Sequence, residues 1–562
     1  MLKKSILLIA SAALVVSFAG IARAQVVIAP STPQIGSSNP VTAEPLVSRP
    51  TTKPCTVTLF TNQAFENFNS PTFPYTPPSS CPGPWAKVVF TADFTVVGAP
   101  QYDRTGNLYI GQSLVYFGTT AEPSSINPAW HVERDVTDLS ATFQTPQTGT
   151  VNLGNNMCCG LNGIIYMNAA LEFYPANFVN PAPRTPDIVI GVNNGTANTA
   201  TLNTSTDTVS QTLNLPTNVE KVYLDVTAQN QNEDEFYYLN VPNDQTGNLE
   251  DYGNTSYRET EVTIDGTPAG IAPVYPWIFT GGIDPYMWIP IPATQTLNLK
   301  SYRVDLTPFA GLLADGNTHT VAISEFNANQ YFEVTANLLV YTDHGTQKVT
   351  GGVVENTLAA TPTAKIKENI TYNSSTSTYT GTIFTGYTHA FTIKGYVNTS
   401  HGRVETTISQ NLNYAGNQEF DVNPSVGYPE TQNQQQLTTV DTDTTTQEGF
   451  FVQRSVSHLA YPLNVKYFYG LNTQGVLYQN TAIDQGYQLS TVENLFGRGP
   501  FSTNTFEQTK SQDDWNLSTG APSNTKSSQT YQYNDSRGGC YSETLTSANN
   551  VLTGVTNGCD RK

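Results

Sequence analysis

Alternation of apolar and polar residues is the dominant pattern over the first two thirds of the chain. Such segments, each bounded by Gly, Pro or Asp, occur at 88–90, 94–97, 107–110, 114–117, 221–227, 261–264, 302–306, 320–324 and 331–341. A period of two residues predicts half-buried β-strands. Helical periodicity is nowhere sustained over about twelve residues. We therefore predict an all-β fold.

Two parts of this region resemble each other. The tripeptide Tyr-Asp-Arg at 102–104 precedes a predicted strand and a Gly111 turn, as Tyr-Arg-Glu at 257–259 precedes a strand and an Asp-Gly turn. Further matched pairs of segments are 134–139 with 304–309, and 168–174 with 335–341. Internal similarity at this spacing predicts two β-sandwich domains of like topology, at 55–190 and 191–345.

The two ends of the chain carry weaker patterns. Residues 25–54 are rich in Pro, Ser, Thr and Val without a period, which predicts a linker or extended arm. In residues 346–562, short predicted strands such as 465–469 and 476–479 alternate with Thr, Gln and Asn tracts such as 432–447. We predict a third, β-rich domain there, of unknown role.

The N-terminus indicates export. Lys3 and Lys4 precede an apolar run at 6–21, and Ala-Arg-Ala at 22–24 is a small-residue cleavage pattern. These features predict a signal peptide over 1–24 and a secreted or periplasmic mature protein. No later segment reaches the roughly 20 apolar residues of a membrane-spanning helix.

Composition excludes several functions. Only 13% of the 562 residues are charged, and 26 basic residues face 45 acidic ones, for a net charge of −19. Binding to nucleic acid requires clustered Lys and Arg, and none is present, so we expect no nucleic-acid partner. For the same reason, we expect no attraction to an anionic membrane surface.

Six cysteines in an exported chain predict disulfides. Local pairing favours two bridges, Cys55–Cys81 and Cys540–Cys559, each contributing about 3 kcal/mol by loop closure. The adjacent Cys158 and Cys159 could bond to each other or elsewhere. A thiol nucleophile is disfavoured, because His131 is the only histidine near them in sequence.

Carboxylates are the remaining candidates for chemistry. The six histidines are scattered without zinc-ligand spacing, and no nucleophile elbow or phosphate loop occurs, so we expect neither a metal nor a cofactor. Glu233, Asp234 and Glu235 form an acidic run in a chain that uses charge sparingly. Like charges raise the pKa of a neighbouring carboxyl, which is how general acids are made. By composition alone, a solvated loop or a calcium site is the commoner interpretation of this run.

A resemblance changes that balance. The motifs Thr-Lys-Pro-Cys at 52–55, Tyr-Asp-Arg at 102–104, Ala-Glu-Pro at 121–123, Asp-Glu-Phe at 234–236, Arg-Glu at 258–259, Thr-Gly-Gly-Ile at 280–283 and Asp-Leu-Thr-Pro-Phe at 305–309 recur in this order in one family. The chain resembles the peptide-N-(N-acetyl-β-glucosaminyl)asparagine amidases of the A type over about residues 50–345. The resemblance implies a glycoamidase that releases N-glycans from asparagine of glycopeptides and glycoproteins, leaving aspartate.

A more distant similarity, to the flavobacterial type of glycoamidase, implies two eight-stranded antiparallel jelly rolls side by side. Its catalytic Asp-Arg pair precedes a strand, which implies Asp103 as general base and Arg104 as its orienting partner. Its second acid precedes an aromatic residue, which implies Glu235, with a pKa raised by Glu233 and Asp234. A third carboxylate has no counterpart, and Asn155 stands near its place. Arg258 and Glu259, the repeat's echo, are expected to be structural.

Sugar rings bind to aromatic faces and polar side chains. The expected substrate-binding residues are therefore Glu122, Asn155, Glu233, Asp234, Tyr237, Tyr238, Trp277 and Trp288. A site whose only catalytic groups are carboxyls predicts that enzyme activity is highest below neutral pH. Two other functions stay open, a glycoside hydrolase that cuts between sugars and a glycan-binding protein without catalysis.

Overall fold

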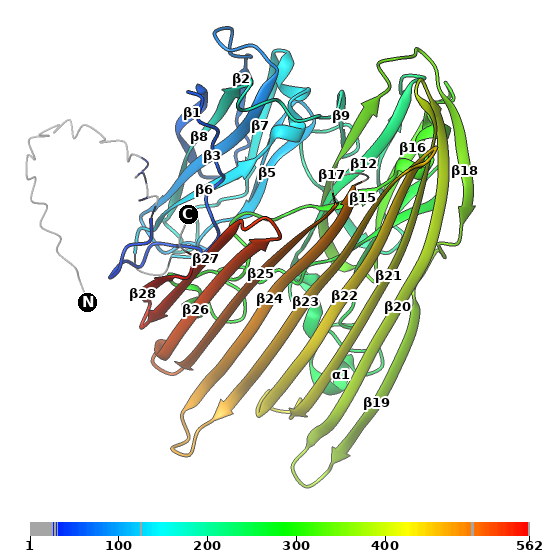
Figure 1. Ribbon diagram of the computed structural model, residues 1–562. Coiled ribbons are helices and arrows are strands. Elements are labelled where there is room, and N and C mark those ends of the chain that lie inside the picture. The colour runs from blue at the N-terminus through cyan, green and yellow to red at the C-terminus, as the bar shows by residue number, and fades with distance from the viewer. Residues whose placement is uncertain are drawn as a thin grey trace, which may run out of the picture.

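Strands make up most of the molecule (Figure 1). The computed structural model describes residues 32–123, 126–495 and 499–559, together with 26, 28 and 30; the predicted signal peptide lies outside these residues. Within them the α-helices are two four-residue turns, α1 (Thr246–Leu249) and α2 (Ala310–Leu313). None of the described helices is long and apolar enough to cross a membrane. The all-β prediction is confirmed.

The first sandwich packs two four-stranded antiparallel sheets against each other. Its strands are β1 (Cys55–Phe65), β2 (Thr72–Tyr75), β3 (Trp85–Val97), β4 (Thr105–Ile110), β5 (Ser113–Thr119), β6 (Ala129–Asp135), β7 (Gln147–Leu153) and β8 (Ile164–Pro175). The strand orders are β1-β8-β3-β6 and β2-β7-β4-β5. Eight antiparallel strands in this order form a jelly roll.

The second sandwich repeats the first strand for strand. It contains β9 (Ile188–Val192), β10 (Ala200–Thr204), β11 (Val209–Leu213), β12 (Val219–Asn230), β13 (Glu259–Ile264), β14 (Thr267–Pro273), β15 (Tyr302–Asp305), β16 (His319–Phe326) and β17 (Asn329–Thr342). The orders are β10-β17-β12-β15 and β11-β16-β13-β14, with β9 added beside β17. The matched segments of the sequence thus occupy equivalent strands.

The repeat extends to hydrogen bonds at equivalent turns. In the first sandwich, Asp135 Oδ1 accepts the Thr137 N–H at 3.1 Å where η1 (Thr137–Leu139) begins. In the second, Asp305 Oδ1 accepts the Thr307 N–H at 2.9 Å at η6 (Thr307–Phe309). The same capping arrangement in both copies shows why the two Asp-x-Thr motifs recur. The other short 3₁₀ turns are η2 (Thr142–Gln144), η3 (Asn232–Asp234), η4 (Tyr237–Leu239) and η5 (Pro285–Trp288).

Residues 350–557 form one antiparallel sheet of eleven strands beside the second sandwich (Figure 1). They are β18 (Thr350–Asn356), β19 (Thr363–Asn373), β20 (Thr378–Thr399), β21 (Gly402–Val422), β22 (Glu430–Glu448), β23 (Phe451–Leu471), β24 (Leu477–Leu495), β25 (Gly499–Asn516), β26 (Ala521–Asp535), β27 (Cys540–Ala548) and β28 (Val551–Asn557). This sheet is called the C-terminal sheet below.

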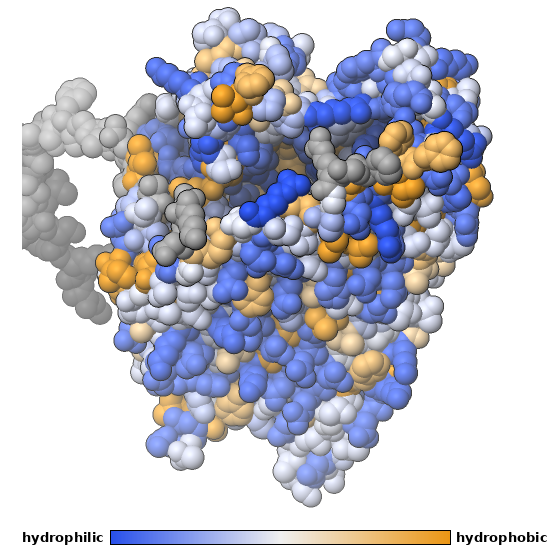
Figure 2. Space-filling model, viewed as in Figure 1, coloured by the Kyte–Doolittle hydropathy of each residue, from blue (hydrophilic) through white to orange (hydrophobic). Residues whose placement is uncertain are grey.

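The C-terminal sheet corrects the prediction of short strands separated by polar tracts. Residues 432–447 lie wholly inside the 19-residue strand β22. Alternate glutamines of this strand are buried against the second sandwich, and Gln432 donates to the Leu239 carbonyl at 2.8 Å. A buried glutamine whose amide is hydrogen-bonded can stand on the inner face of a strand in place of an apolar residue. In this strand, therefore, both the buried and the exposed positions are polar. The opposite face is largely hydrophilic (Figure 2).

The segment before β1 runs across the molecule without a helix or strand among its described residues. The Gly36 N–H donates to the Leu552 carbonyl at 2.8 Å, which ties the segment to the C-terminal sheet. Arg49 pairs with Glu133 and Glu172 of the first sandwich. The arm therefore contacts both regions.

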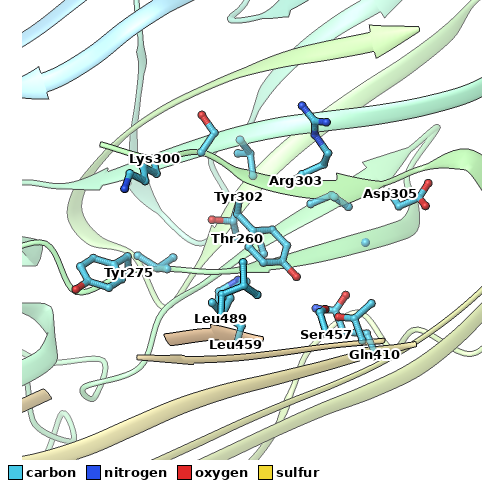
Figure 3. Close-up of a pocket in the computed structure, with 18 of the residues that line it drawn as sticks. Thr260, Tyr275, Lys300, Tyr302, Arg303, Asp305, Gln410, Ser457, Leu459 and Leu489 are labelled. Carbon is cyan, nitrogen blue, oxygen red and sulfur yellow. The ribbon is translucent and has the colours of Figure 1, made fainter. Parts of the chain in front are cut away.

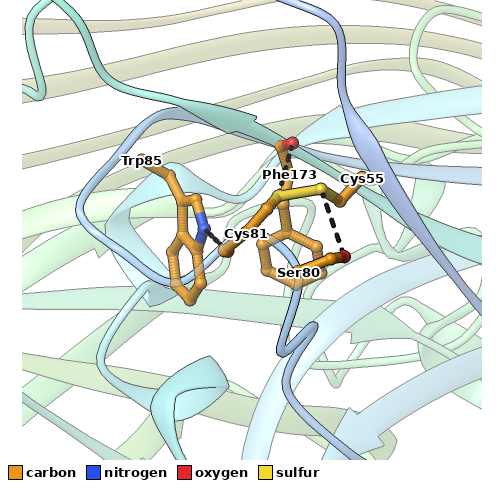
Figure 4. Close-up of a disulfide and its surroundings, with 5 residues drawn as sticks. All are labelled: Cys55, Ser80, Cys81, Trp85 and Phe173. Atoms are coloured by element: carbon orange, nitrogen blue, oxygen red, sulfur yellow. Dashed lines mark hydrogen bonds between the residues drawn. A yellow bond between two sulfur atoms is a disulfide. The ribbon is translucent and has the colours of Figure 1, made fainter.

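Both predicted disulfides are present. Cys55, the first residue of β1, bonds Cys81, and the Trp85 indole donates to the Cys81 carbonyl at 2.9 Å (Figure 4). Cys540 at the start of β27 bonds Cys559 beyond β28. Cys158 and Cys159 are exposed and form no disulfide within the described residues.

Candidate functional site

A cavity of about 440 Å³ lies between the two sandwiches. Asp103 and Arg104, which precede β4, line it from the first sandwich, and Glu235, which follows η3, lines it from the second. Its other lining residues are Phe68, Ser70, Thr105, Asn107, Thr119, Asn152, Leu153, Gly154, Asn198, Gln231, Phe279, Tyr331 and Glu333. The structure thus brings together the three residues expected to be catalytic.

Asp103 is held by a backbone donor from the second sandwich. Its Oδ2 accepts the Gly281 N–H at 2.8 Å. Burial raises the pKa of Asp103 above its usual value, while the Gly281 N–H and the charge of Arg104 oppose this shift. A carboxylate that is oriented and partly desolvated in this way is suited to general-base chemistry.

Glu122 lies directly beside Asp103. Its Oε2 accepts the Asp103 N–H at 3.3 Å. Burial, and then the charge of Asp103, raise the pKa of Glu122 to about 7. Gly281 packs so closely on both acids that a Cβ there would overlap the Glu122 carboxylate and lie 2.9 Å from Asp103 Oδ1.

Arg104 is oriented by the first sandwich rather than by Asp103. Its Nη2 donates to Gln101 Oε1 at 2.8 Å, and Gln101 is itself buried with its amide bonded to the Gly163 carbonyl at 3.0 Å. The guanidinium lies 5.5 Å from the ring centre of the exposed Tyr102. Arg104 therefore contributes positive charge at the cavity wall, while the backbone of Gly281 orients Asp103.

Glu235 has a raised pKa for a different reason from the one predicted. Burial, and then the charge of Asp103, raise it to about 7. Glu233 and Asp234 are not among the causes of this pKa shift. Asp234 points into the core and pairs with Arg258, and both of these side chains are fully buried. The main-chain carbonyl of Glu235 accepts the Asn230 amide, which fixes the start of the following turn.

Three further predicted site residues have structural contacts. Asp234 accepts the Arg258 Nη2–H at 2.6 Å, as expected if Arg258 is structural. Glu233 accepts the Asn329 side-chain amide at 3.2 Å. Asn155 is fully buried and donates to the Phe65 carbonyl at 2.9 Å. None of the three lines the cavity.

The four aromatic residues expected to contact sugar lie in the core. Tyr237, Tyr238, Trp277 and Trp288 are each at most 3% exposed. These four rings pack against other side chains of the core. A side chain without exposed surface offers no face to a ligand. The aromatic residues that do line the cavity are Phe68, Phe279 and Tyr331. Phe68 is 64% exposed.

Sequence reasoning missed several of these cavity residues. Phe68 lies in the loop after β1, and Tyr331 and Glu333 lie in β17, far along the chain from Asp103. Burial raises the pKa of Glu333, whose Oε2 accepts the Thr199 hydroxyl at 2.8 Å. For Gly281, which donates to Asp103, the sequence did offer a signal, the Thr-Gly-Gly-Ile motif at 280–283.

A second cavity, of about 400 Å³, lies between the second sandwich and the C-terminal sheet (Figure 3). Gln410, Ser457 and Leu459 line its sheet side, and Tyr302 and Thr260 its sandwich side. The cations at its edge have partners, since Lys300 pairs with Glu44 and Arg303 with Asp225. Asp305 is the one carboxyl among the described residues that line this cavity, so acids do not converge here as they do around Asp103.

Among the described residues, one group of possible metal-ligand side chains lies close together. Ligand atoms of Glu220, Asp343 and His401 lie within 4.8 Å of one another. Glu220 already pairs with Arg184, and Asp343 accepts the Ser400 N–H at 2.5 Å. The group is therefore satisfied by the protein and is not part of the cavity around Asp103.

Comparison with known proteins identifies related sequences. A family model described as peptide N-acetyl-beta-D-glucosaminyl asparaginase amidase A matches residues 40–359. Peptide-N4-(N-acetyl-beta-glucosaminyl)asparagine amidase A of Prunus dulcis is 28% identical over 387 residues. That alignment covers 65% of this chain and 66% of the relative, so the chain spans about two thirds of the relative's length.

Solved structures show a weaker similarity. PNGase F, a glycosylasparaginase from Flavobacterium meningosepticum, aligns with a TM-score of 0.35 and 12% identity, covering 52% of this chain and 96% of that one. PNGF-II aligns with a TM-score of 0.35 and 12% identity, covering 52% of this chain and 66% of that one.

Proposed function

The chain belongs to the peptide N-acetyl-beta-D-glucosaminyl asparaginase amidase A family, and from this premise we propose that it hydrolyses the amide bond between an N-glycan and asparagine. The substrates are N-glycosylated peptides and glycoproteins. The products are an aspartate-containing peptide and the free glycan, released first as its 1-amino derivative.

The observation that carries this proposal is that Asp103 and Glu235 line one cavity, with Glu122 in contact with Asp103 behind the wall. The two glutamates have pKa values of about 7, so both are largely protonated at mildly acidic pH. Burial raises the pKa of Asp103, and the Gly281 N–H and the charge of Arg104 oppose this shift, so that we assign Asp103 as the ionised base and the glutamates as the acids. The site therefore holds a base and an acid at once, as amide hydrolysis requires.

In the proposed reaction, Asp103 takes a proton from a water molecule as that water attacks the asparagine side-chain carbonyl. Arg104 stabilises the negative charge that develops on the carbonyl oxygen. Glu235 then gives its proton to the leaving nitrogen, and the carbon–nitrogen bond breaks. Glu122 limits the local negative charge by remaining protonated beside Asp103.

Aromatic faces on the cavity wall support a sugar ligand. Phe68 and Tyr331 line the cavity beside the polar side chains of Gln231, Asn107 and Asn152. Exposed rings beside amide groups suit pyranose rings, which have apolar faces and hydroxyl edges. We assign the sugar contacts to these residues in place of the four buried aromatics.

The setting of this activity is proposed to be extracellular or periplasmic. The leader predicted over 1–24 and the two disulfides support this location. The low density of charge and the absence of a basic cluster in the sequence fit a partner that is neutral glycan rather than nucleic acid.

Mass spectrometry of one defined glycopeptide tests the function. A glycoamidase converts the glycosylated asparagine to aspartate and leaves no sugar on the peptide. Retention of one N-acetylglucosamine would identify a glycosidase, and an unchanged glycopeptide that still binds would identify a non-catalytic glycan-binding protein. Either result would overturn the proposal.

A further inference from the structure

The loop that carries Gly281 joins the candidate site to the C-terminal sheet. At one end, the Gly281 N–H bonds Asp103 and the Thr280 hydroxyl bonds the Thr120 carbonyl at 2.8 Å. At the other end, the Ile283 carbonyl accepts the Gln479 amide at 3.1 Å, and the Met287 carbonyl accepts the Ser511 hydroxyl at 2.7 Å. The position of the Asp103 donor therefore depends on how this loop is seated on the C-terminal sheet.

Two carboxyl groups meet at that seat. Asp284 of the loop is 0% exposed and Asp513 of β25 is 1% exposed. Asp284 Oδ1 accepts the Tyr286 N–H at 3.0 Å, and the Asp513 carboxylate accepts the Thr525 hydroxyl. The Oδ2 atom of each aspartate is buried and lacks a donor among the described residues. The two carboxyl groups interact with each other, and either can donate a hydrogen bond to the other once it is protonated.

The charges around the pair favour this shared proton. Within the described residues, neither carboxyl has a cationic partner. Burial raises the pKa of Asp513, against the Thr525 hydroxyl and Asp284, which lower it, and the charge of Asp514 on the same strand raises it further. The titratable Tyr467 of β23 lies near Asp284. Burial, and then Asp513, raise the pKa of Asp284 to about 7. Two buried unpaired charges in contact are costly, so the pair retains one proton.

We propose that the Asp284–Asp513 pair is a positioning device for the candidate site, in which one shared proton joins the Gly281 loop to the C-terminal sheet. The pair contacts no substrate and acts through the Gly281 N–H that orients Asp103. Loss of the shared proton places two charges against each other and loosens the loop. The C-terminal sheet thereby acquires a role in catalysis. The catalytic part of this inference rests on the proposed function.

Replacement by asparagine tests the proton requirement. In Asp284→Asn, the amide supplies the hydrogen permanently, keeps the Tyr286 contact and carries the same net charge as the singly protonated pair. We expect this variant to retain activity within about threefold at pH 6. Asp284→Ala removes the contact, and a displaced donor is expected to lower kcat/KM by about 10- to 100-fold.

Hydrogen exchange of residues 279–288 provides a readout that needs no substrate. After correction for intrinsic rates, the wild-type loop should lose protection between pH 6 and pH 8, whereas Asp284→Asn should keep it. Asp484→Asn, which alters a partly exposed acid of β24, is the matched control and should behave as the wild type. Equal loss of protection in Asp284→Asn, or full activity and protection in Asp284→Ala, would overturn the proposal. If the protein has no glycoamidase activity, the exchange result still decides the role of the pair.

Discussion

Asp103 of the first sandwich and Arg258 of the second occupy equivalent positions, each just before the first strand of a repeated hairpin. Asp103 faces a cavity, and its neighbour Tyr102 is 55% exposed. Arg258 is 2% exposed, and its neighbours Tyr257 and Glu259 are 1% and 0% exposed. The same place in the fold is open in one copy and closed in the other.

Arg258 and Glu259, the two charged residues of this motif in the closed copy, have protein partners. Arg258 donates to the carbonyls of Asn254, Thr255 and Tyr257 as well as to Asp234. Glu259 accepts the Tyr257 hydroxyl at 2.7 Å and bonds His389 of β20 at 2.8 Å. These groups are satisfied for stability and leave nothing for a ligand.

What covers each hairpin explains the difference. The C-terminal sheet packs on the second copy, and its strand β20 supplies His389. The first copy is covered by loops of the second sandwich, which leave the 440 Å³ cavity. Repetition of a fold therefore places residues at equivalent points, and the neighbouring element decides whether those points become core or site.

Asp103→Asn tests the open copy and should have the largest effect. Removal of the base is expected to lower kcat/KM for a glycopeptide by at least about 10²-fold. The melting temperature should change by only a few degrees, because the asparagine oxygen can still accept the Gly281 N–H. Asp135→Asn, outside the cavity, is the control. Near wild-type turnover by a folded Asp103→Asn protein would make Glu235, the acid of the 233–235 run that lines the cavity, the leading source of the base.

Arg258→Ala tests the closed copy. It leaves the buried Asp234 without its cation and should lower the free energy of unfolding by about 3–5 kcal/mol. Urea unfolding measures this change. Arg303→Ala removes a more exposed pair and should cost about 1 kcal/mol or less. A stable Arg258→Ala protein that has lost only activity would refute the structural role of Arg258, and with it the comparison between the open and the closed copy.

Gly281→Ala tests the contact between the copies. The added Cβ would overlap the Glu122 carboxylate, so the loop or the acids must shift. A displacement near 1 Å is expected to lower kcat by about 10- to 100-fold with a smaller change in KM. Gly247→Ala is the control, since no atom lies within 4 Å of its added Cβ. Unchanged steady-state kinetics would show that this close packing is unnecessary.

The pH dependence should have the smallest effect of the four. Glu122 and Glu235 have pKa values raised to about 7, so activity that needs a protonated acid falls as pH rises through about 7. Their contribution to stability has the same sign, because a raised pKa in the folded state favours folding at low pH and is lost as pH rises. A kcat/KM profile from pH 4 to 9 checks the prediction, with Glu235→Gln expected to weaken the alkaline decline. An optimum above pH 8 would contradict these roles.

The amino-acid sequence alone determined the all-β class, about half of the sandwich strands and the equivalence of the two sandwiches. Apolar alternation and the Asp-x-Thr turns are local properties, so the matched segments 134–139 and 304–309 identify equivalent points of the two sandwiches, where β6 and β15 end. The local disulfides were predictable for the same reason. The candidate base followed from the resemblance to a known family, and the structural role of Arg258 followed from the internal repeat.

Only the tertiary structure decided which residues share the site. Alternation tells which face of a strand a side chain occupies, and says nothing of what covers that face. The glutamines of β22 therefore looked like a loop, and Tyr237, Tyr238, Trp277 and Trp288 looked available to sugar although the core encloses them. Gly281 and Tyr331 reach the cavity around Asp103 through packing between the two sandwiches, an arrangement that arises from contacts distant in sequence and so leaves no local pattern.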